Sequence, residues 1–377
     1  MKLIVAKDNL FKMLAKVNSV ISGKVTTSEI YSCVLMETQG DRIQLTGTDG
    51  EVTVMGWIPA QIETDGQLAI PAKKFMDVVR DWRHETITIE NKDHNGVFTS
   101  GKSNYRLSGY DPTLYPERPE TVENFDYEIP AKIIGNVIET VSFAVAVDDP
   151  RPAFMGIYWV MKPNGFDLVA TDTHKLARVF YKVEPIKRGA MDTNRDAIVP
   201  PKALRLLTKL ENEEMPMLYV KFETNHMVLK VQDFMVYTNL LRGPFPEYER
   251  VIPFNNETVA EVSVNELKQA LRSVSQLSNL NTHLVKFNFT EETLGMSGMN
   301  IESGDEATDE IPIQFKGDAL QIGFNSEYIL TILKALDCEK VIFKLKLSNT
   351  ATLVIPSEQP ENQEIQYVVM PLKFQEV

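Results

Sequence analysis

The fold is decided by a stretch near the amino terminus that reads LFKMLAKV over residues 10–17. Four of its apolar positions follow the i, i+3, i+4, i+7 spacing of one helix face. They are Leu10, Met13, Leu14 and Val17. The same stripe returns over residues 134–141 and 267–274, at offsets of 124 and 133 residues. Three helices with one pattern and nearly one period predict three copies of a single module.

A second helical pattern recurs with a similar period. It begins at residues 70–75, 199–204 and 324–329, whose last positions are 129 and 125 residues apart. Proline or Asn-Ser opens each segment, and the first turn of a helix does not use the backbone donor that proline lacks. Runs such as 42–46 and 340–345 have the composition of strands. The sequence therefore predicts an α+β fold of three tandem modules, each with two helices packed on antiparallel sheets of about eight strands.

Two proline-rich segments mark the expected boundaries between the modules. Residues 110–119 close the first module and residues 245–253 close the second. The expected modules span residues 1–122, 123–253 and 254–377. Asp8-Asn9 and Ser263 lie near the starts of two helices, where we expect them to act as N-caps.

Composition places the chain among ordinary globular proteins, with 43% apolar and 24% charged residues. No stretch reaches the roughly 18 consecutive apolar residues of a membrane helix. The only two cysteines, Cys33 and Cys338, lie far apart in apolar settings. We therefore expect a cytoplasmic protein without a disulfide framework.

The net charge of −13 is unusual for a nucleic-acid binder, but the charge is unevenly distributed. Six helical windows together contain thirteen basic and five acidic residues. These windows are 7–16, 73–80, 131–141, 202–210, 265–274 and 325–334. The helices therefore carry +8 and the rest of the chain −21. Because no base-reading motif accompanies this positive surface, the pattern predicts a sequence-neutral grip on a polyanion.

The size of the modules predicts how many are needed to enclose a duplex. A module of this length has a diameter of roughly 35 Å. Six such bodies in a ring leave a hole of about 35 Å, enough for a duplex about 20 Å wide, whereas three leave almost none. Since each chain supplies three modules, we expect two chains joined end to end.

Four stretches in the second and third modules carry a family resemblance. They read RPAFMG at 151–156, ATDTHKLA at 170–177, FPEYERVIP at 245–253 and YVVMPLKF at 367–374. In this order and spacing, they make the chain resemble the bacterial DNA polymerase III β subunit, the processivity clamp, over essentially its whole length. The resemblance implies a non-enzymatic sliding clamp without a cofactor or metal, in which a head-to-tail homodimeric ring encircles double-stranded DNA.

The resemblance also implies the partners and where they bind. They would be the α subunit of the replicative DNA polymerase with its 3′-5′ exonuclease complex, the clamp loader, and other replication and repair proteins. Each would dock a short peptide into an apolar pocket between modules two and three, and no membrane is involved. The implied pocket residues are Phe154, Thr171, Thr173, His174, Lys175, Leu176, Pro246, Arg250, Val251, Thr352, Val368, Met370, Pro371 and Leu372.

Two further sets of residues follow from the same resemblance. The implied DNA contacts are Lys24, Lys73, Lys74, Arg80, Arg151, Lys202 and Arg205. The implied dimer interface joins Tyr105 and Leu107 to Gln276 and Leu277. The chain departs from the family at Thr173, where glycine is usual, and at Lys175 and Lys24, where arginine is usual. The departures at Thr173 and Lys175 predict a partner-peptide consensus that differs from the usual one, because a β-branched residue narrows one lobe of the pocket and lysine lacks the planar fork of arginine.

Two other functions can be weighed against the clamp. The five histidines are scattered without an i, i+4 pair or a CxxC companion, so the sequence offers no metal site. Asp172 and His174 have no activated nucleophile beside them, and Thr48-Asp49 occupies the equivalent turn of the first module, which favours an Asx turn over catalysis. A repeat-built ligand- or peptide-binding adaptor that does not encircle DNA remains the alternative, but it does not explain the basic helices.

Overall fold

The computed structural model of the chain describes residues 1–21, 28–183, 186–187, 195–208 and 217–374. Two compact units divide the chain. Unit 1 comprises Met1–Gly135, Pro185–Thr193 and Lys202–Leu240, and unit 2 comprises Asn136–Glu184, Asn194–Pro201 and Leu241–Val377. Lys24, one of the expected DNA contacts, lies outside the described residues.

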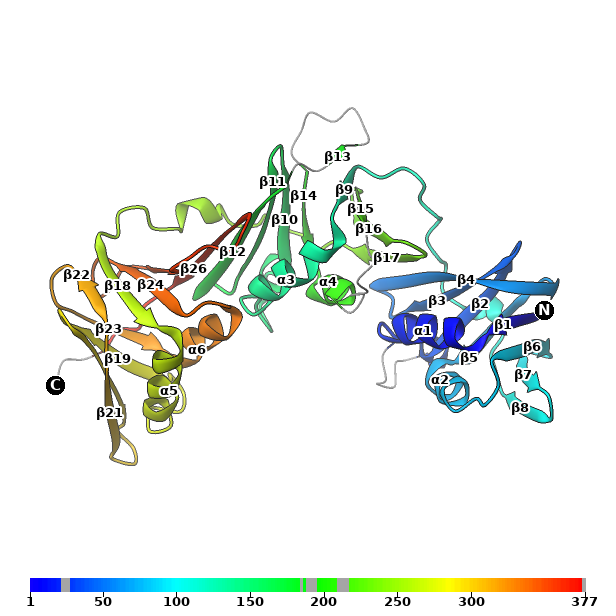
Figure 1. Cartoon of the computed structure of the whole chain (residues 1–377), viewed down its shortest axis with the longest axis horizontal. Coiled ribbons are helices and arrows are strands. Elements are labelled where there is room, and N and C mark those ends of the chain that lie inside the picture. Colours follow the sequence, from blue (N-terminus) through cyan, green and yellow to red (C-terminus); the bar gives the residue numbers. More distant parts are fainter. Residues whose placement is uncertain (22–27, 184–185, 188–194, 209–216, 375–377) are drawn as a thin grey trace. The chain divides into compact units, whose positions relative to one another are not determined.

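The described residues of the first module form two helices and eight strands, all within unit 1. Helix α1 (Lys7–Asn18) buries its predicted stripe against β3 and β4, and α2 (Ala72–Arg80) lies beside it (Figure 1). The strands are β1 (Lys2–Ala6), β2 (Cys33–Gln39), β3 (Arg42–Thr48), β4 (Val52–Thr64), β5 (Gln67–Pro71), β6 (Thr86–Lys92), β7 (Asn95–Ser100) and β8 (Ser103–Leu107).

The second module contributes strands to both units. Its helices are α3 (Ala131–Ser142) and α4 (Pro201–Thr208). In unit 1 lie β9 (Tyr127–Ile129), β13 (Ile186–Lys187), β15 (Leu218–Phe222), β16 (His226–Val231) and β17 (Phe234–Asn239). In unit 2 lie β10 (Ile157–Lys162), β11 (Gly165–Thr171), β12 (Lys175–Lys182) and β14 (Asp196–Val199).

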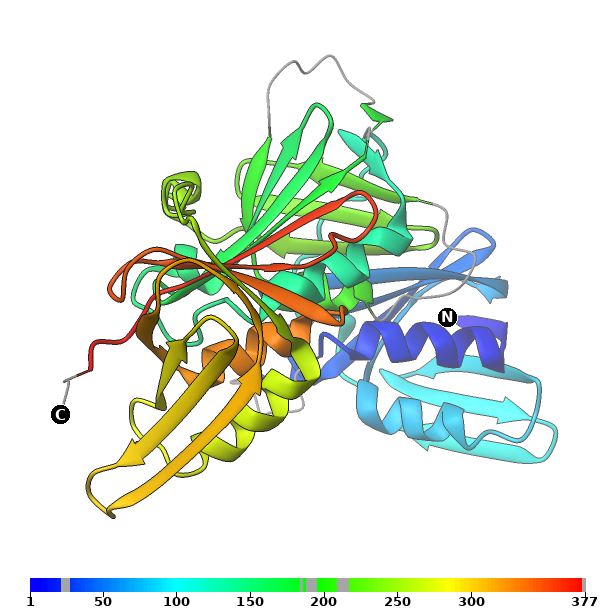
Figure 2. The ribbon, with the colours of Figure 1, turned by 60° about the vertical axis from the view of Figure 1, so that its left-hand side comes forward.

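The third module lies wholly in unit 2, where α5 (Val264–Ser275) and α6 (Ser326–Ala335) are neighbours (Figure 2). Its strands are β18 (Thr258–Ser263), β19 (Leu284–Phe289), β20 (Thr293–Asn300), β21 (Asp305–Pro312), β22 (Gln314–Lys316), β23 (Leu320–Asn325), β24 (Lys340–Leu345), β25 (Thr352–Pro356) and β26 (Gln363–Val369). The predicted pair of helices on antiparallel strands is thus confirmed in each module, and the described residues of modules two and three form nine strands each rather than eight.

The helix caps follow the sequence prediction in one case and not in the other. Ser263 caps α5, where its hydroxyl accepts a hydrogen bond from the backbone N–H of Glu266 at 3.4 Å. The predicted cap at Asp8-Asn9 is wrong, because α1 begins at Lys7 and its N-cap, Ala6, has no side-chain acceptor. Asp8 lies instead in the first helical turn, where a carboxylate still favours the positive end of the helix dipole.

The last strand of a module continues the sheet of the module before it. In unit 1, β17 pairs antiparallel with β4, from Val52 opposite Thr238 to Gly56 opposite Phe234. In unit 2, β26 pairs with β12, from Lys175 opposite Val369 to Tyr181 opposite Gln363. These joints build a 13-stranded sheet in unit 1 and a 9-stranded sheet in unit 2, beside a 4-stranded sheet of the third module. The strand β8, the last of the first module, ends its sheet, and β21 ends the 4-stranded sheet.

Candidate functional site

The turn between β11 and β12 carries four of the expected pocket residues. One carboxylate oxygen of Asp172 accepts hydrogen bonds from the backbone N–H groups of His174 at 3.0 Å and Lys175 at 2.8 Å. The Thr171 hydroxyl donates to the Lys175 carbonyl at 2.8 Å and accepts from the Thr173 N–H at 3.2 Å. Asp172 therefore forms the Asx turn that the sequence predicted, and its carboxylate has a structural role.

Thr173 adopts a backbone conformation that favours glycine. Its φ angle is 77°, in the left-handed region. A β-branched residue is a rare occupant of this region, and the conformation costs roughly 1–2 kcal/mol for a residue with a Cβ. The glycine that the family resemblance leads one to expect here is thus explained by the backbone, and threonine introduces strain in the turn that carries candidate site residues.

The pairing of β12 with β26 brings together residues from the middle and the end of the chain. Leu176 lies opposite Val368, and the His174 carbonyl accepts a hydrogen bond from the Met370 N–H at 2.9 Å. Thr352 pairs with Val369 on the next strand. Leu176, Val368 and Thr352 are buried, whereas 40% of Met370 is exposed. The buried members thus form the floor of the candidate site and Met370 part of its surface.

The segment that precedes the third module packs on this floor. Tyr248 and Ile252, each 6% exposed, join one apolar cluster with Leu176 and Val368. Between them Val251 is 43% exposed, and the exposed Arg250 forms an ion pair with Glu247 at 2.6 Å. Pro246, Arg250 and Val251 are therefore held beside the strands that carry Leu176 and Val368.

The remaining expected pocket residues lie further out. Leu372 donates its backbone N–H to the Gly323 carbonyl at 2.8 Å, which places the segment of Pro371 and Leu372 beside β23. Phe154 is half-buried, and the Arg151 guanidinium lies 4.1 Å from its ring centroid. Within the described residues, Phe154 does not join the apolar cluster around Leu176.

Tyr328 on the first turn of α6 also belongs to the candidate site, although the sequence did not single it out. The Lys175 ammonium lies 4.5 Å from its ring centroid, and the His174 ring stacks at 6.2 Å. Lys175 also forms an ion pair with Asp172. Burial and the nearby carboxylates of Asp172 and Glu327 raise the pKa of the Tyr328 hydroxyl. The sequence around Tyr328 indicated only the start of a helix, because the proximity of α6 to the turn depends on the tertiary fold.

The expected DNA contacts differ in how free their charges are. Lys73 and Lys74 are exposed on the first turn of α2, and neither forms an ion pair with another described residue. Arg80 is shared between Asp77 at 3.0 Å and Asp81 at 3.3 Å. Arg205 is exposed on α4. Lys73 and Lys74 therefore offer their full charge to a phosphate, whereas Arg80 does not.

Two other expected DNA contacts are also paired with carboxylates. Lys202 forms an ion pair with Asp49 and donates to the Val20 carbonyl at 3.2 Å. Arg151 makes two side-chain hydrogen bonds to Asp149, each of 2.9 Å. These bonds and the backbone N–H of Arg151 lower the pKa of Asp149 to about 2. A phosphate would have to compete with a carboxylate for either cation.

The expected dimer residues are accessible in their separate units. Tyr105 on β8 is 48% exposed and packs on Trp82 with ring centroids 5.2 Å apart, while Leu107 is half-buried. Gln276 and Leu277, directly after α5, are both exposed. The sequence missed that β8 and β21 are sheet edges, because an edge is a property of topology.

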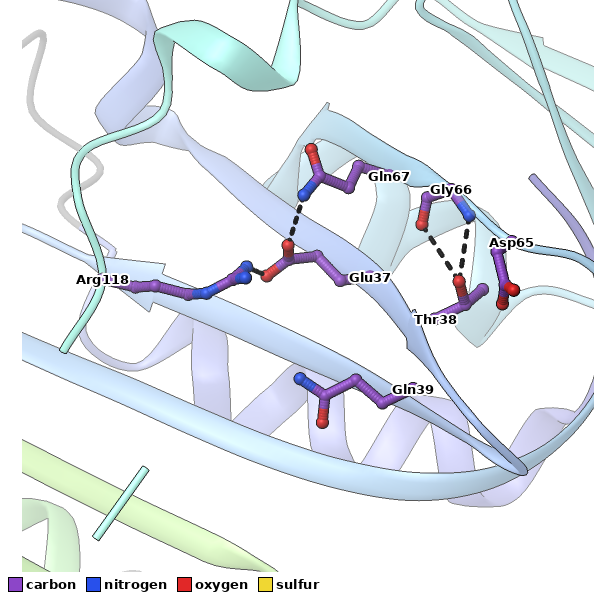
Figure 3. A pocket seen from close by; sticks show the side chains of 7 residues that line it. All are labelled: Glu37, Thr38, Gln39, Asp65, Gly66, Gln67 and Arg118. Carbon is purple, nitrogen blue, oxygen red and sulfur yellow. Dashed lines mark hydrogen bonds and ion pairs between the residues drawn. The ribbon is translucent and has the colours of Figure 1, made fainter. Parts of the chain in front are cut away.

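A polar pocket of about 480 Å³ lies in the first module, away from the candidate peptide site in sequence and in chemistry (Figure 3). Glu37, only 3% exposed, forms an ion pair with Arg118 and accepts a hydrogen bond from the Gln67 amide at 2.6 Å. The other residues that line the pocket are Thr38, Gln39, Asp65 and Gly66. Because large apolar side chains are missing from this lining, the pocket does not suit leucine or phenylalanine anchors. Arg118 belongs to the segment after β8, and the ion pair fixes that segment to β2.

Neither a metal-ligand group nor a membrane-spanning helix occurs among the described residues. Among them, no group of three His, Cys, Asp or Glu side chains is arranged to hold a metal ion. In the same ranges, no helix is long and apolar enough to cross a membrane.

Three copies of a module with two helices on antiparallel sheets define the class of DNA clamps. Three family models match the chain in order: the N-terminal domain of the DNA polymerase III beta subunit at residues 1–119, its central domain at 128–247 and its C-terminal domain at 249–373. The chain therefore belongs to the DNA polymerase III beta subunit family.

Individual relatives agree with the family models. The beta sliding clamp of Haemophilus influenzae is 29% identical over 377 residues, which cover 99% of this chain and 100% of the relative. The crystal structure of the DNA polymerase III subunit beta from Pseudomonas aeruginosa is similar, with a TM-score of 0.91, 27% identity and coverage of 99% and 100%. A Pseudomonas aeruginosa clamp bound to griselimycin has a TM-score of 0.90, 26% identity and the same coverage.

The family resemblance seen in the sequence is thus confirmed. The chain is a non-catalytic DNA sliding clamp, a ring-forming homodimer that serves a DNA polymerase. The alternative of an adaptor that does not encircle DNA is not favoured.

Proposed function

We propose that two copies of this chain close head to tail around duplex DNA and hold the α subunit of the replicative polymerase in the cytoplasm. In each chain, modules 1–122, 123–253 and 254–377 would contribute their basic helices to the inner surface. Family membership carries this proposal, and the excess of positive charge on the helices supports it. Such a surface binds phosphates without reading bases, as a protein that slides along DNA requires.

The ring itself is tested by topology and mass. With a clamp loader and ATP, the protein is expected to be retained on nicked circular DNA and lost from linear DNA. Its solution mass should be about twice the 42.7 kDa of one chain. A stable monomer at micromolar concentration, or equal loss from circular and linear DNA, would contradict the encircling dimer.

The proposed DNA contacts are Lys24, Lys73, Lys74, Arg80, Arg151, Lys202 and Arg205, and they are not expected to contribute equally. Each neutralised phosphate adds about 0.9 to the slope of log K against log salt. Lys73→Ala with Lys74→Ala should therefore lower the slope by roughly 2, measured by fluorescence polarisation on a labelled duplex. Lys202→Ala should lower the slope by less than the roughly 0.9 expected for one phosphate contact, because Asp49 already neutralises this cation. A change of about 0.9 for Lys202→Ala, half that of the double variant, would show that the pairing of Lys202 with Asp49 does not matter.

For the closure of the ring, we propose that β8 of one chain pairs with β21 of its partner. Both strands are sheet edges, and the joints between modules inside the chain also use the last strand of a module. Their charges are complementary: β8 carries Arg106, whereas β21 carries Asp305, Glu306, Asp309 and Glu310. In this joint, Tyr105 and Leu107 on β8 of one chain would contact Gln276 and Leu277 of the other chain.

A charge reversal tests the proposed closure. Arg106→Glu places a negative charge against the acidic strand and should shift the protein toward monomer in analytical ultracentrifugation. Adding Glu306→Lys and Asp309→Lys to the same chain should restore the dimer. Lys346→Glu, an exposed position between β24 and β25, serves as the control and should leave the dimer unchanged. A dimer that resists Arg106→Glu would place the joint elsewhere.

The site between β12, β26 and the segment 245–252 is the proposed docking site for peptides of the polymerase, the clamp loader and other replication and repair proteins. Its proposed residues are Phe154, Thr171, Thr173, His174, Lys175, Leu176, Pro246, Arg250, Val251, Thr352, Val368, Met370, Pro371 and Leu372. The pairing of β12 with β26 supports this proposal, because it brings Lys175 and Leu176 beside Val369 and Val368. Tyr248 and Ile252 of the segment 245–252 pack in the same apolar cluster as Leu176 and Val368. Griselimycin, present in the structures of related clamps, is a suitable second probe for this chain.

Two exposed residues allow the docking site to be tested without damage to the core. Val251 and Met370 are 43% and 40% exposed, whereas Leu176 is 3% exposed and supports the fold. Val251→Ala with Met370→Ala should weaken the binding of a short synthetic peptide with leucine and phenylalanine anchors (the Leu-Phe peptide) by at least about tenfold. Each substitution removes apolar contact area. Leu114→Ala, exposed in the first module, is the matched control. Unchanged affinity in isothermal titration calorimetry would sink the assignment.

A further inference from the structure

A fully buried carboxylate lies beneath the proposed docking site in unit 2. Asp167 on β11 has no exposed surface. One of its oxygens accepts from Arg178 Nε at 2.8 Å. The other accepts from Lys162 Nζ at 2.5 Å and from the Tyr248 hydroxyl at 3.0 Å. Two cations and one hydroxyl thus converge on a single charge.

The partners of Asp167 extend to two other parts of the site. Arg178 on β12 donates to Gln366 at 2.7 Å and lies 3.5 Å from Glu364, both on β26. Lys162 on β10 lies 3.5 Å from Glu249, next to Tyr248. The network therefore connects three of the segments that carry proposed docking residues: β12, β26 and the segment 245–251.

Stability alone does not account for such a cluster. Removing a carboxylate completely and two cations largely from water carries a large desolvation cost. Well-packed apolar side chains are often as stable or more stable at such sites. Charge-assisted hydrogen bonds do define geometry, because they are short and directional. The segment 245–251 contains only a single 3-10 turn, Tyr248–Arg250, so its position depends on its side-chain anchors.

Tyr248 is the anchor that links the charge to the docking surface. Its ring packs in the apolar cluster with Leu176 and Val368, and its hydroxyl reaches Asp167. Its carbonyl accepts the backbone N–H of Val251 at 3.0 Å. Fixing the Tyr248 ring therefore also fixes Val251, whose side chain is exposed at the site.

We infer that Asp167 and Tyr248 are positioning residues for peptide docking. The buried carboxylate holds the Tyr248 hydroxyl and thereby keeps the segment from Pro246 to Val251 in its peptide-binding geometry. This inference rests on the proposed docking function. Without the anchor, the segment has to be ordered when the peptide binds, and that ordering lowers affinity.

Removal of a single hydroxyl tests the inference. Tyr248→Phe keeps the ring in the apolar cluster and should weaken binding of the Leu-Phe peptide about three- to tenfold. Tyr158→Phe is the matched control, because its ring centroid lies 6.2 Å from that of Tyr248 while its hydroxyl donates to Asp196 at 3.0 Å. The control should bind as the wild type does. Equal affinities for Tyr248→Phe and the wild type would overturn the inference.

A double-mutant cycle separates positioning from a general loss of stability. Asp167→Asn is combined with Tyr248→Phe, and peptide affinity is measured on the intact homodimer well below its melting temperature. If the two residues act as one anchor, adding Asp167→Asn to Tyr248→Phe should weaken peptide binding by less than about a further twofold. Affinity losses that are additive between the two substitutions would contradict the inference. If Asp167→Asn does not fold, the comparison of Tyr248→Phe with Tyr158→Phe decides alone. A wild-type protein that binds no peptide would overturn the docking proposal and this inference together.

Discussion

The turns Thr48–Val52 and Thr171–Lys175 have the same hydrogen bonds in two different modules. In the first, one Asp49 oxygen accepts from the N–H groups of Glu51 at 3.0 Å and Val52 at 2.8 Å. The Thr48 hydroxyl bonds to the Val52 carbonyl at 3.1 Å and accepts from Gly50 at 3.1 Å. The corresponding four bonds of the second turn involve Thr171 and Asp172. The Asp49-Gly50 pair and the Asp172-Thr173 pair are therefore equivalent positions.

The two turns differ in their third residue and in the origin of their cation. The left-handed position is glycine in the first turn, Gly50 with φ 91°, and threonine in the second, Thr173 with φ 77°. Asp49 pairs with Lys202 on α4, whereas Asp172 pairs with Lys175 of its own turn. The first turn is thus unstrained and tied to another element of unit 1. The second is strained and closed on itself, and it forms part of a candidate binding surface.

The largest expected effect is the loss of either carboxylate. Each carboxylate accepts hydrogen bonds from two backbone N–H groups and from a lysine ammonium. Hydrogen bonds to a charged group contribute about 1.5–3 kcal/mol each, and water replaces part of this contribution when the carboxylate is removed. Asp49→Ala and Asp172→Ala should each lower the free energy of unfolding by about 3 kcal/mol in urea. Asp318→Ala, at an exposed position with no such contacts, is the control. A loss below about 1 kcal/mol would mean that water replaces the carboxylate in the turn.

An intermediate effect is expected from exchanging the third residues. Gly50→Thr should cost about 1–2 kcal/mol, since the nearest atom to an added Cβ is 3.6 Å away and only the backbone conformation opposes it. Thr173→Gly should gain about 0.5 kcal/mol, because relief of strain exceeds the extra entropy of an unfolded glycine by a small margin. Urea unfolding of both variants measures the difference. Similar small costs for both exchanges would show that the second turn carries no strain.

Much of the fold was readable from the sequence, because the residues that specify it act locally. The stripe Leu10–Val17 buries all four predicted positions, as expected for an amphipathic helix. The segment 340–345 forms β24 with the predicted bounds. The Asx turn at Asp172 was predicted from the repeat of Thr48-Asp49. In each case the deciding interactions lie within a few residues of one another.

The features that escaped the sequence depend on contacts between distant segments. Tyr328 joins the site only because α6 lies near the turn of His174. Asp167 looks like a surface residue on a strand until Arg178 and Tyr248 are placed around it. The pairing of Lys202 with Asp49 spans 153 residues, and it leaves the charge of Lys202 less free to bind a phosphate. Periodicity predicts which face of an element is buried, but not which charges meet.

The smallest expected effect concerns the cation of the first turn. Burial opposes ionisation of Asp49, but hydrogen bonds from Lys202, Val52 and Glu51 outweigh it and lower the pKa of this carboxyl below its ordinary value of 3.8. A depressed pKa contributes stability that is present above pH 3.8 and is lost as the pH falls through the folded-state value. Lys202→Met should therefore cost less than about 1 kcal/mol at pH 7, because Lys202 is 43% exposed and Asp49 keeps its two backbone donors.

The pH dependence distinguishes this ion pair from simple packing of the lysine stem. The difference in unfolding free energy between the wild type and Lys202→Met should shrink as the pH falls below about 4, since a protonated Asp49 gains little from the cation. In an Asp49→Asn background, Lys202→Met should have almost no effect at any pH. A difference that stays constant from pH 7 to pH 3 would assign the contribution of Lys202 to its methylene groups. The first turn would then be joined to α4 by contact area rather than by charge. Its carboxylate would interact only within its own turn, as the carboxylate of Asp172 does with the backbone and Lys175 of the second turn.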